Sequence, residues 1–268
     1  MKIASSSPHD NDFLLHVNTS YVVTTDSMMK FIPMLKLYTM KSFFFCGIRV
    51  DKVDFSEIYD SIQDDASVYV VKQVITLNPE IAYDSWHNEE LHKALFDASF
   101  VIPDGTGIVM AAKRKGYYLQ RQPGIELAEY LLSKGENLSF FFYGAQPGVA
   151  HKAVENLKKR YKFKLAGIAH GYSSEAEALK RIQESGADVL LVATGAPKQD
   201  LFIYRNKEKL GVKLALGIGG SFDVWAGIKK RAPKWMRKLH LEWLWRAGLN
   251  PNRWKRLAKA FRFTLICR

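Results

Sequence analysis

The sequence predicts an α/β domain with a mainly parallel sheet. Short apolar runs alternate with helical patterns between residues 45 and 228, and most runs end in a cluster of turn-forming residues. Strands that alternate with helices at this spacing are typical of parallel sheets. The chain has 268 residues, of which 47% are hydrophobic, enough for one large domain with a substantial core.

Six apolar runs are predicted to be the strands of this sheet. They cover residues 69–75, 100–102, 138–143, 163–168, 189–193 and 214–218. The segments between them carry helical patterns, as in Val149, Ala153 and Leu157, which share one helix face. Ligands of parallel sheets bind at the carboxyl ends of the strands, and the turns there hold Gly, Asn, Asp, Thr and Gln. This edge is therefore the predicted site, with phosphate as the expected ligand group.

The net charge of +12 is concentrated at the C-terminus. Residues 1–228 carry 26 basic and 26 acidic side chains, whereas residues 229–268 carry 13 basic residues and one acid, Glu242. Five of the six tryptophans also fall in this region or just before it: Trp225, Trp235, Trp243, Trp245 and Trp254. We therefore predict an N-terminal extension over residues 1–44, partly disordered and with Met40 as an alternative start, an α/β domain over 45–228, and a basic, aromatic helical appendage over 229–268.

Nothing in the sequence predicts export. The apolar run around Phe43–Ile48 is much shorter than the roughly 20 residues of a membrane-spanning helix, and the N-terminus lacks the pattern of a secretory signal. Cys46 and Cys267 lie near opposite ends and have no metal or redox spacing, which favours a reducing cytoplasm.

The C-terminal segment predicts a basic amphipathic helix. After Pro251, apolar residues follow i, i+3, i+4, i+7 and i+11 spacing, and basic residues fill much of the remainder: Trp254, Leu257, Ala258, Phe261 and Leu265, with Arg253, Lys255, Arg256, Lys259 and Arg262. Three interpretations stay open: a charged face packed on the domain, a nucleic-acid surface, or a surface for anionic lipid or a lipid diphosphate. The mixture of aromatic and basic residues favours the third.

Several residues at the strand ends are candidates for the site, each with a structural alternative. Asp104 follows a strand within Pro-Asp-Gly, which is either a turn or a carboxylate aimed into the cleft. Thr76 and Asn78 could cap a helix. The glycine clusters 105–107, 144–148 and 217–220 form no complete dinucleotide-binding or Walker motif, which disfavours a nicotinamide enzyme.

Eight motifs in one order resemble the bacterial TagA/WecG/CpsF glycosyltransferases, or glycosyltransferase family 26. The motifs occupy residues 47–51, 76–80, 103–107, 121–127, 195–200, 219–223, 231–233 and 241–243. The resemblance covers about Phe45 to Arg262. It implies a single Rossmann-like domain with a C-terminal helical appendage.

The resemblance also implies the reaction. Similar enzymes transfer N-acetylmannosamine from UDP to N-acetylglucosamine-diphospho-undecaprenol, inverting to a β-1,4 linkage, in teichoic acid or surface polysaccharide synthesis. We therefore expect a UDP-sugar donor, a polyprenyl-diphosphate acceptor, no metal and no cofactor. We also expect peripheral binding of residues 229–268 to the anionic inner leaflet, a possible homo-oligomer, and no nucleic-acid partner.

Carried over by position, the resemblance assigns roles to individual residues. Asp104 is the expected catalytic base, and Thr76, Asn78, Arg121 and Gln199 would position the sugar and the acceptor. The UDP-sugar side is expected to use Tyr172, Gly195, Gln199, Gly219 and Asp223. Arg246, Arg253 and Arg256 of the appendage would neutralise the diphosphate, because without a metal the departing phosphate needs a cationic partner. A chain ending near Lys230 is then expected to fold and bind UDP but to lose transfer.

Departures from the family pattern are small. Asp200 stands where Glu is common, and Glu126 where Asp is common. They leave open the same fold with UDP-glucose or another UDP-sugar for an exopolysaccharide. A nucleic-acid-binding protein that uses the basic C-terminus is the second alternative.

Overall fold

The computed structural model describes residues 41–63, 70–233, 235–236, 242–248 and 254–267, which all belong to one compact unit, Thr39–Arg268. The predicted disorder of the first dozen residues and the alternative start at Met40 lie outside the described residues. The predicted domain boundaries stay predictions.

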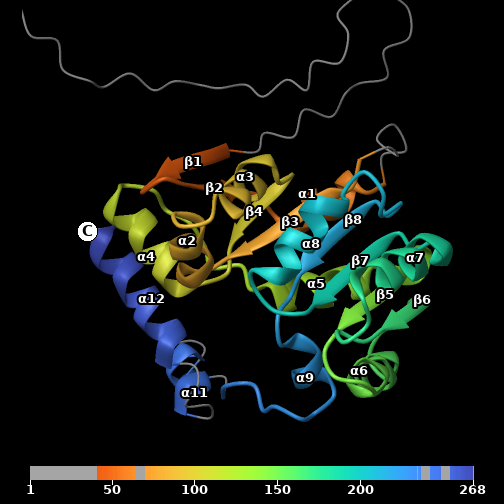
Figure 1. Cartoon of the computed structure of the whole chain (residues 1–268). Coiled ribbons are helices and arrows are strands. Elements are labelled where there is room, and N and C mark those ends of the chain that lie inside the picture. The colour runs from red at the N-terminus through yellow and green to blue at the C-terminus, as the bar shows by residue number, and fades with distance from the viewer. Residues whose placement is uncertain (1–40, 64–69, 234, 237–241, 249–253, 268) are drawn as a thin grey trace, which may run out of the picture. The chain divides into compact units, whose positions relative to one another are not determined.

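Within the described residues, six parallel strands form one sheet in the order β4-β3-β8-β7-β5-β6 (Figure 1). The strands are β3 (Lys72–Leu77), β4 (Phe100–Pro103), β5 (Ser139–Gly144), β6 (Lys164–Ala169), β7 (Val189–Ala193) and β8 (Leu214–Gly217). Each coincides with one of the six predicted runs, so the prediction of an α/β fold with a mainly parallel sheet is confirmed.

Helices cover both faces of the sheet because side chains alternate along each buried strand. Phe140 and Phe142 of β5 enter one core cluster, and Phe141 and Tyr143 enter another on the opposite face. The first face is covered by α1 (Phe55–Ser61), α5 (Gly124–Ser133), α6 (Val149–Lys158) and α9 (Ser221–Trp225). The second is covered by α2 (Pro79–Ser85), α3 (Glu89–Asp97), α4 (Thr106–Arg114), α7 (Glu175–Ser185) and α8 (Lys198–Asn206). A 3-10 turn, η2 (Gly135–Asn137), precedes β5.

A β-hairpin protects the outer edge of the sheet at β4. It consists of β1 (Lys41–Phe45) and β2 (Ile48–Lys52), which pair antiparallel. The buried Asp51 carboxylate accepts hydrogen bonds from the backbone N–H of Val101, at 2.7 Å, and from Arg49 Nε, at 3.0 Å. The hairpin begins at Lys41, inside the segment assigned above to the N-terminal extension. The sequence did not indicate this strand, because Lys-Ser-Phe-Phe-Phe has no alternation of apolar and polar residues and is aligned by its pairing with residues 48–52.

The two cysteines meet in the structure, contrary to the expectation from their positions in the sequence. Cys46, in the turn of the hairpin, pairs with Cys267 as a disulfide, with Cα atoms 5.8 Å apart. The sequence separation of 221 residues hides this proximity, which arises because the last helix returns to the hairpin. The contact fixes the end of the chain on the body of the domain.

Two helices of the appendage are described, α11 (Glu242–Gly248) and α12 (Trp254–Ile266). Helix α12 lies along α2 and next to α4 (Figure 1). Phe263 is fully buried against the core, and its ring stacks on Trp86 with centroids 5.4 Å apart. Ion pairs from Lys259 to Asp84, at 2.7 Å, and from Arg256 to Glu80, at 3.4 Å, flank this contact. No described helix has the length and hydropathy needed to span a membrane.

Candidate active site

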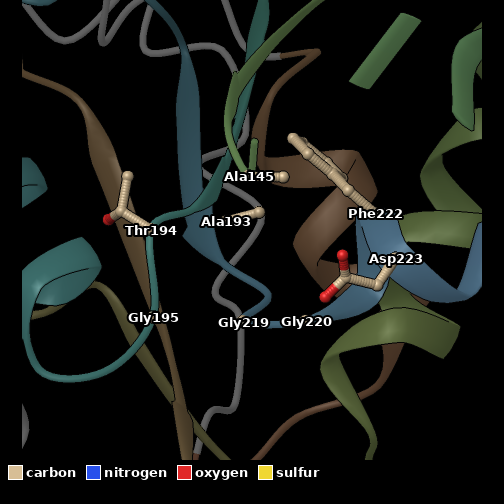
Figure 2. A pocket seen from close by; sticks show the side chains of 8 residues that line it. All are labelled: Ala145, Ala193, Thr194, Gly195, Gly219, Gly220, Phe222 and Asp223. Carbon is tan, nitrogen blue, oxygen red and sulfur yellow. The ribbon is translucent and has the colours of Figure 1, made fainter. Parts of the chain in front are cut away.

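The carboxyl ends of the strands hold a first cavity of about 190 Å³ (Figure 2). Its walls come from the turns after β5, β7 and β8: Ala145, Ala193, Thr194, Gly195, Gly219, Gly220, Phe222 and Asp223. The connection from β5 runs outward to β6, whereas the connection from β7 runs the other way to β8. The cavity therefore lies at a topological switch point, where open α/β sheets bind nucleotides.

Close packing at one position and positive φ values at others favour glycine at this switch point. Gly144 has a φ of 134°, and a Cβ atom there would lie 2.4 Å from the Ala193 carbonyl carbon. Gly195 and Gly219 have positive φ values of 90° and 53°. These conformations favour glycine and bring backbone groups to the cavity wall, where a phosphate or a nucleoside can approach them.

Asp223 supplies the carboxylate of this cavity (Figure 2). Its Oδ2 lies 2.5 Å from Lys229 Nζ, so the ion pair links α9 to the first residue of the predicted appendage. A carboxylate at this position can accept hydrogen bonds from hydroxyl or amide N–H groups of a ligand.

A second cavity of about 380 Å³ shares no wall residue with the first. One side is built from the ends of β3 and β4 with α2 and α4: Asn78, Pro79, Glu80, Asp104, Gly105, Thr106, Gly107, Met110 and Arg121. The other side is built from the appendage: Glu242, Trp243, Arg256, Leu257, Ala260, Phe261 and Thr264. Polar groups lie at the strand ends, and apolar groups line α4 and α12.

Asp104 lies in this second cavity, directly after β4. Its backbone N–H donates to Leu77 O, at 2.9 Å, which ties its turn to the end of β3. Its Oδ1 accepts a hydrogen bond from the N–H of Gly124, at 3.2 Å, where α5 begins. A carboxylate held by backbone groups at a strand end has the fixed orientation that a general base requires.

Arg121 joins the Asp104 turn to the appendage. Its Nε donates to Asp104 O, at 2.7 Å, and its Nη2 lies 2.8 Å from Glu242 Oε2 in α11. Both side chains are largely buried, with exposed fractions of 16% and 7%.

Three other predicted catalytic residues make contacts that shape the strand ends. Thr76 Oγ1 donates to Gly217 O, at 2.9 Å, and links β3 to β8. Asn78 caps α2 by accepting from the N–H groups of Glu80 and Ile81. The buried Gln199 accepts from the N–H of Gly219, at 2.9 Å, and so shapes the turn that borders the first cavity.

Asp200, next to Gln199, is a buried carboxylic acid that the sequence did not mark for function. Both of its oxygens are buried and lack a hydrogen-bond partner among the described residues. Burial raises the pKa of Asp200 to about 7. A carboxylate without partners in the interior is disfavoured against its neutral acid.

Of the remaining predicted site residues, some line a cavity and others do not. Tyr172 is exposed in the turn after β6 and is not among the residues that line the first cavity. Arg256 lines the second cavity and pairs there with Glu80; its role toward a diphosphate stays a prediction. Arg253 and the side chain of Arg246 lie outside the described residues. Sequence reasoning missed the role of Glu242, although one acid among 13 basic residues was a signal for it.

The exposed face of α12 carries the apolar residues predicted from its periodicity. Trp254 and Phe261 are each 63% exposed, and Leu265 is 52% exposed. The helix contacts the body through Phe263 and Cys267 instead. An unpartnered apolar stripe flanked by basic residues is typical of an interaction surface.

Comparison with known proteins agrees with this geometry. Residues 43–268 match the model of the glycosyl transferase WecG/TagA/CpsF family. An N-acetylglucosaminyldiphosphoundecaprenol N-acetyl-beta-D-mannosaminyltransferase of Bacillus spizizenii is 38% identical over 69% of this chain and 74% of its own length. Relatives with the same name in Bacillus subtilis, 35% identical over 72% of this chain and 77% of its own length, and in Staphylococcus aureus, 35% identical over 69% and 74%, also match. The chain therefore belongs to the WecG/TagA/CpsF family of glycosyl transferases.

Proposed function

We propose that the protein transfers an N-acetylhexosamine, with N-acetylmannosamine as the first choice, from UDP to N-acetylglucosamine-diphospho-undecaprenol. The observation that carries the proposal is Asp104, a carboxylate oriented by the backbone in a cavity with arginines at one end and an apolar wall along α4 and α12. The names of the curated relatives support the acceptor and the sugar. The UDP carrier follows from the family.

The two cavities suit the two substrates. The first, at the switch point, suits the nucleotide, with glycine turns for the diphosphate and Asp223 for a hydroxyl or uracil N–H. The second suits an amphipathic acceptor, because Arg256 can meet its diphosphate and Met110, Leu257 and Phe261 can meet its lipid chain. The end of β3 borders the second cavity and the end of β8 borders the first, and these strands are neighbours in the sheet, which supports transfer between the two sites.

The reaction is a single displacement. The acceptor hydroxyl oxygen attacks the anomeric carbon, Asp104 accepts the hydroxyl proton, and the bond from that carbon to the UDP oxygen breaks on the opposite side. A bond formed on the face opposite the leaving group inverts the configuration. Negative charge then grows on the departing phosphate. No arginine lines the first cavity among the described residues, so the stabilising guanidinium would come from the appendage.

The membrane assignment rests on the appendage. The exposed stripe of Trp254, Phe261 and Leu265 can enter the interface, while basic residues contribute about 1 kcal/mol each near an anionic leaflet. We infer peripheral binding to the cytoplasmic face, where UDP-sugars are available. The exposed aromatic side chains beside these cations favour a lipid surface over a nucleic-acid surface.

The test is UDP release from a panel of UDP-sugars with a short-chain N-acetylglucosamine-diphosphate lipid as acceptor. Acceptor-dependent release with UDP-N-acetylmannosamine that collapses in Asp104→Ala is expected. Release with UDP-glucose or another donor would keep the mechanism and change the sugar. No acceptor-dependent release from any donor would contradict the proposed acceptor.

A further inference from the structure

Glu242 is the one acidic residue among the 40 residues of the basic appendage, and the structure buries it. It begins α11 and is only 5% exposed. A carboxylate taken out of water requires a charged or hydrogen-bonding partner. One partner of this carboxylate is Arg121 of the body, at 2.8 Å.

The contact continues to the catalytic turn. The guanidinium that binds Glu242 also donates from Nε to the carbonyl oxygen of Asp104, at 2.7 Å. That residue is held further by Leu77 O and by the N–H of Gly124. Because the guanidinium is planar, a carboxylate that holds its Nη2 also limits the direction of its Nε–H group. The appendage is thus connected to the Asp104 backbone through a single side chain.

We propose that Glu242 is a positioning residue for the transfer reaction: from α11 it holds Arg121 against the carbonyl oxygen of Asp104, and so adds to the body contacts that orient the base. The proposal rests on the proposed function, because it gives Asp104 and Arg121 their roles. Glu242 acts through Arg121 and does not touch the reacting atoms. The same contact joins the appendage wall of the second cavity to the turn that carries the base.

A competing role for the Glu242 carboxylate would give a different experimental result. Glu242 could occupy the place on Arg121 that a phosphate of the acceptor takes, in which case its removal would strengthen acceptor binding. A positioning role predicts a loss in kcat, whereas a competing role predicts a lower KM for the acceptor. The two roles therefore move different kinetic constants.

The experiment compares Glu242→Gln and Glu242→Ala with the full chain. Glu242→Gln keeps the shape and one acceptor oxygen, so we expect kcat to fall about 10-fold, and about 100-fold for Glu242→Ala, because misplacement of a catalytic group by an ångström costs this much. The Kd for UDP, measured by calorimetry, should stay within about twofold of wild type. The matched control is Asp84→Asn, which breaks another ion pair between the body and the appendage without touching Arg121; its kcat should change by less than about threefold.

A second measurement does not depend on transfer. Arginine Nε–H signals in a protein labelled with ¹⁵N-arginine should include a slowly exchanging one from Arg121, assigned by its absence in Arg121→Lys. This signal should exchange rapidly in both Glu242 variants and stay slow in Asp84→Asn. Such a change supports the proposal even if no donor gives transfer, in which case only the proposed function fails. An unchanged signal, a wild-type kcat in both Glu242 variants, or a lower acceptor KM in Glu242→Gln overturns it.

Discussion

The two cavities at the carboxyl edge of the sheet differ in the origin of their walls. The first is made by three turns of the α/β body, with backbones packed so closely that a Cβ atom at Gly144 would collide with Ala193. The second has one wall from the body and one from the appendage. The proposed donor side is therefore formed by the α/β body alone, and the proposed acceptor side also requires α11 and α12.

Under the proposed function, this difference separates the binding of the UDP-sugar from the transfer of the sugar. A nucleotide site that is formed in the body can load donor at any time, whereas an acceptor site that requires a docked appendage limits transfer to the place where the lipid acceptor is found. Variants that affect one cavity and spare the other test this separation.

The largest effect is expected from the base. Asp104→Asn removes the proton acceptor and keeps the shape of the side chain, so transfer should fall by about 10² to 10⁴. UDP affinity should not change, because Asp104 does not line the first cavity. Turnover and calorimetry on the same preparation measure both quantities. An equal loss of UDP binding would mean that the cavities are not independent.

The next effect concerns the stability of the body and its dependence on pH. Burial raises the pKa of Asp200 from 3.8 to about 7. Between these values the unfolded chain has lost the proton and the folded chain keeps it, so the free energy of unfolding should decrease as pH rises from about 4 to 7 and then level off. The total change is on the order of 4 kcal/mol.

Asp200→Asn tests this pH dependence directly. An amide does not ionise, so urea denaturation at pH 5 and pH 8 should give a smaller difference for the variant than for wild type. The variant should also be the more stable protein at pH 8. Parallel pH profiles for the two proteins would show that Asp200 does not titrate in this range.

A smaller effect is expected at Asp223 in the donor cavity. Asp223→Asn removes the charge that pairs with Lys229 and weakens hydrogen bonds to ligand donors, so the Kd for UDP should rise about 10-fold, or about 1.4 kcal/mol. The acceptor KM should stay the same. A change in acceptor KM that matches the change in Kd would remove the distinction between the two cavities.

The smallest effect belongs to the membrane face of the appendage. Arg262→Gln removes one exposed cation from α12, and binding to vesicles with anionic lipid should weaken about fivefold, or about 1 kcal/mol. Binding to neutral vesicles serves as the control and should not change. An identical response to both vesicle types would argue against an electrostatic contribution from this residue.

Local patterns predicted the sheet well and the long-range contacts poorly. The six strands were visible because β-branched and aromatic runs ended in Gly, Pro, Asn or Asp, and the family resemblance indicated Gly195, Gly219 and Asp223 for the nucleotide side. The pairing of Cys46 with Cys267 and of Arg121 with Glu242 joins residues more than 100 positions apart. Such contacts depend on where the appendage packs against the body, and the periodicity of the sequence does not indicate this position.

The orientation of α12 was likewise only half predictable. Its apolar stripe was evident in the sequence, but a stripe does not indicate whether it faces the protein or a lipid surface. Phe263, which lies off the stripe, packs on Trp86 instead. The roles of Thr76 and Asn78 were equally hard to predict. A polar side chain at a strand end can form hydrogen bonds with the backbone, as both do here, or with a ligand.

The central claim, that the appendage completes the acceptor side and not the donor side, is tested most directly by Phe263→Ala in the full chain. Combined with Cys267→Ser, which removes the disulfide to Cys46, the substitution removes the buried contact of α12 at a cost of about 3–5 kcal/mol, so docking should be lost. The account predicts a UDP Kd within twofold of wild type and transfer reduced at least about 100-fold. Transfer that stays near the wild-type rate, or UDP binding that falls together with transfer, would contradict it.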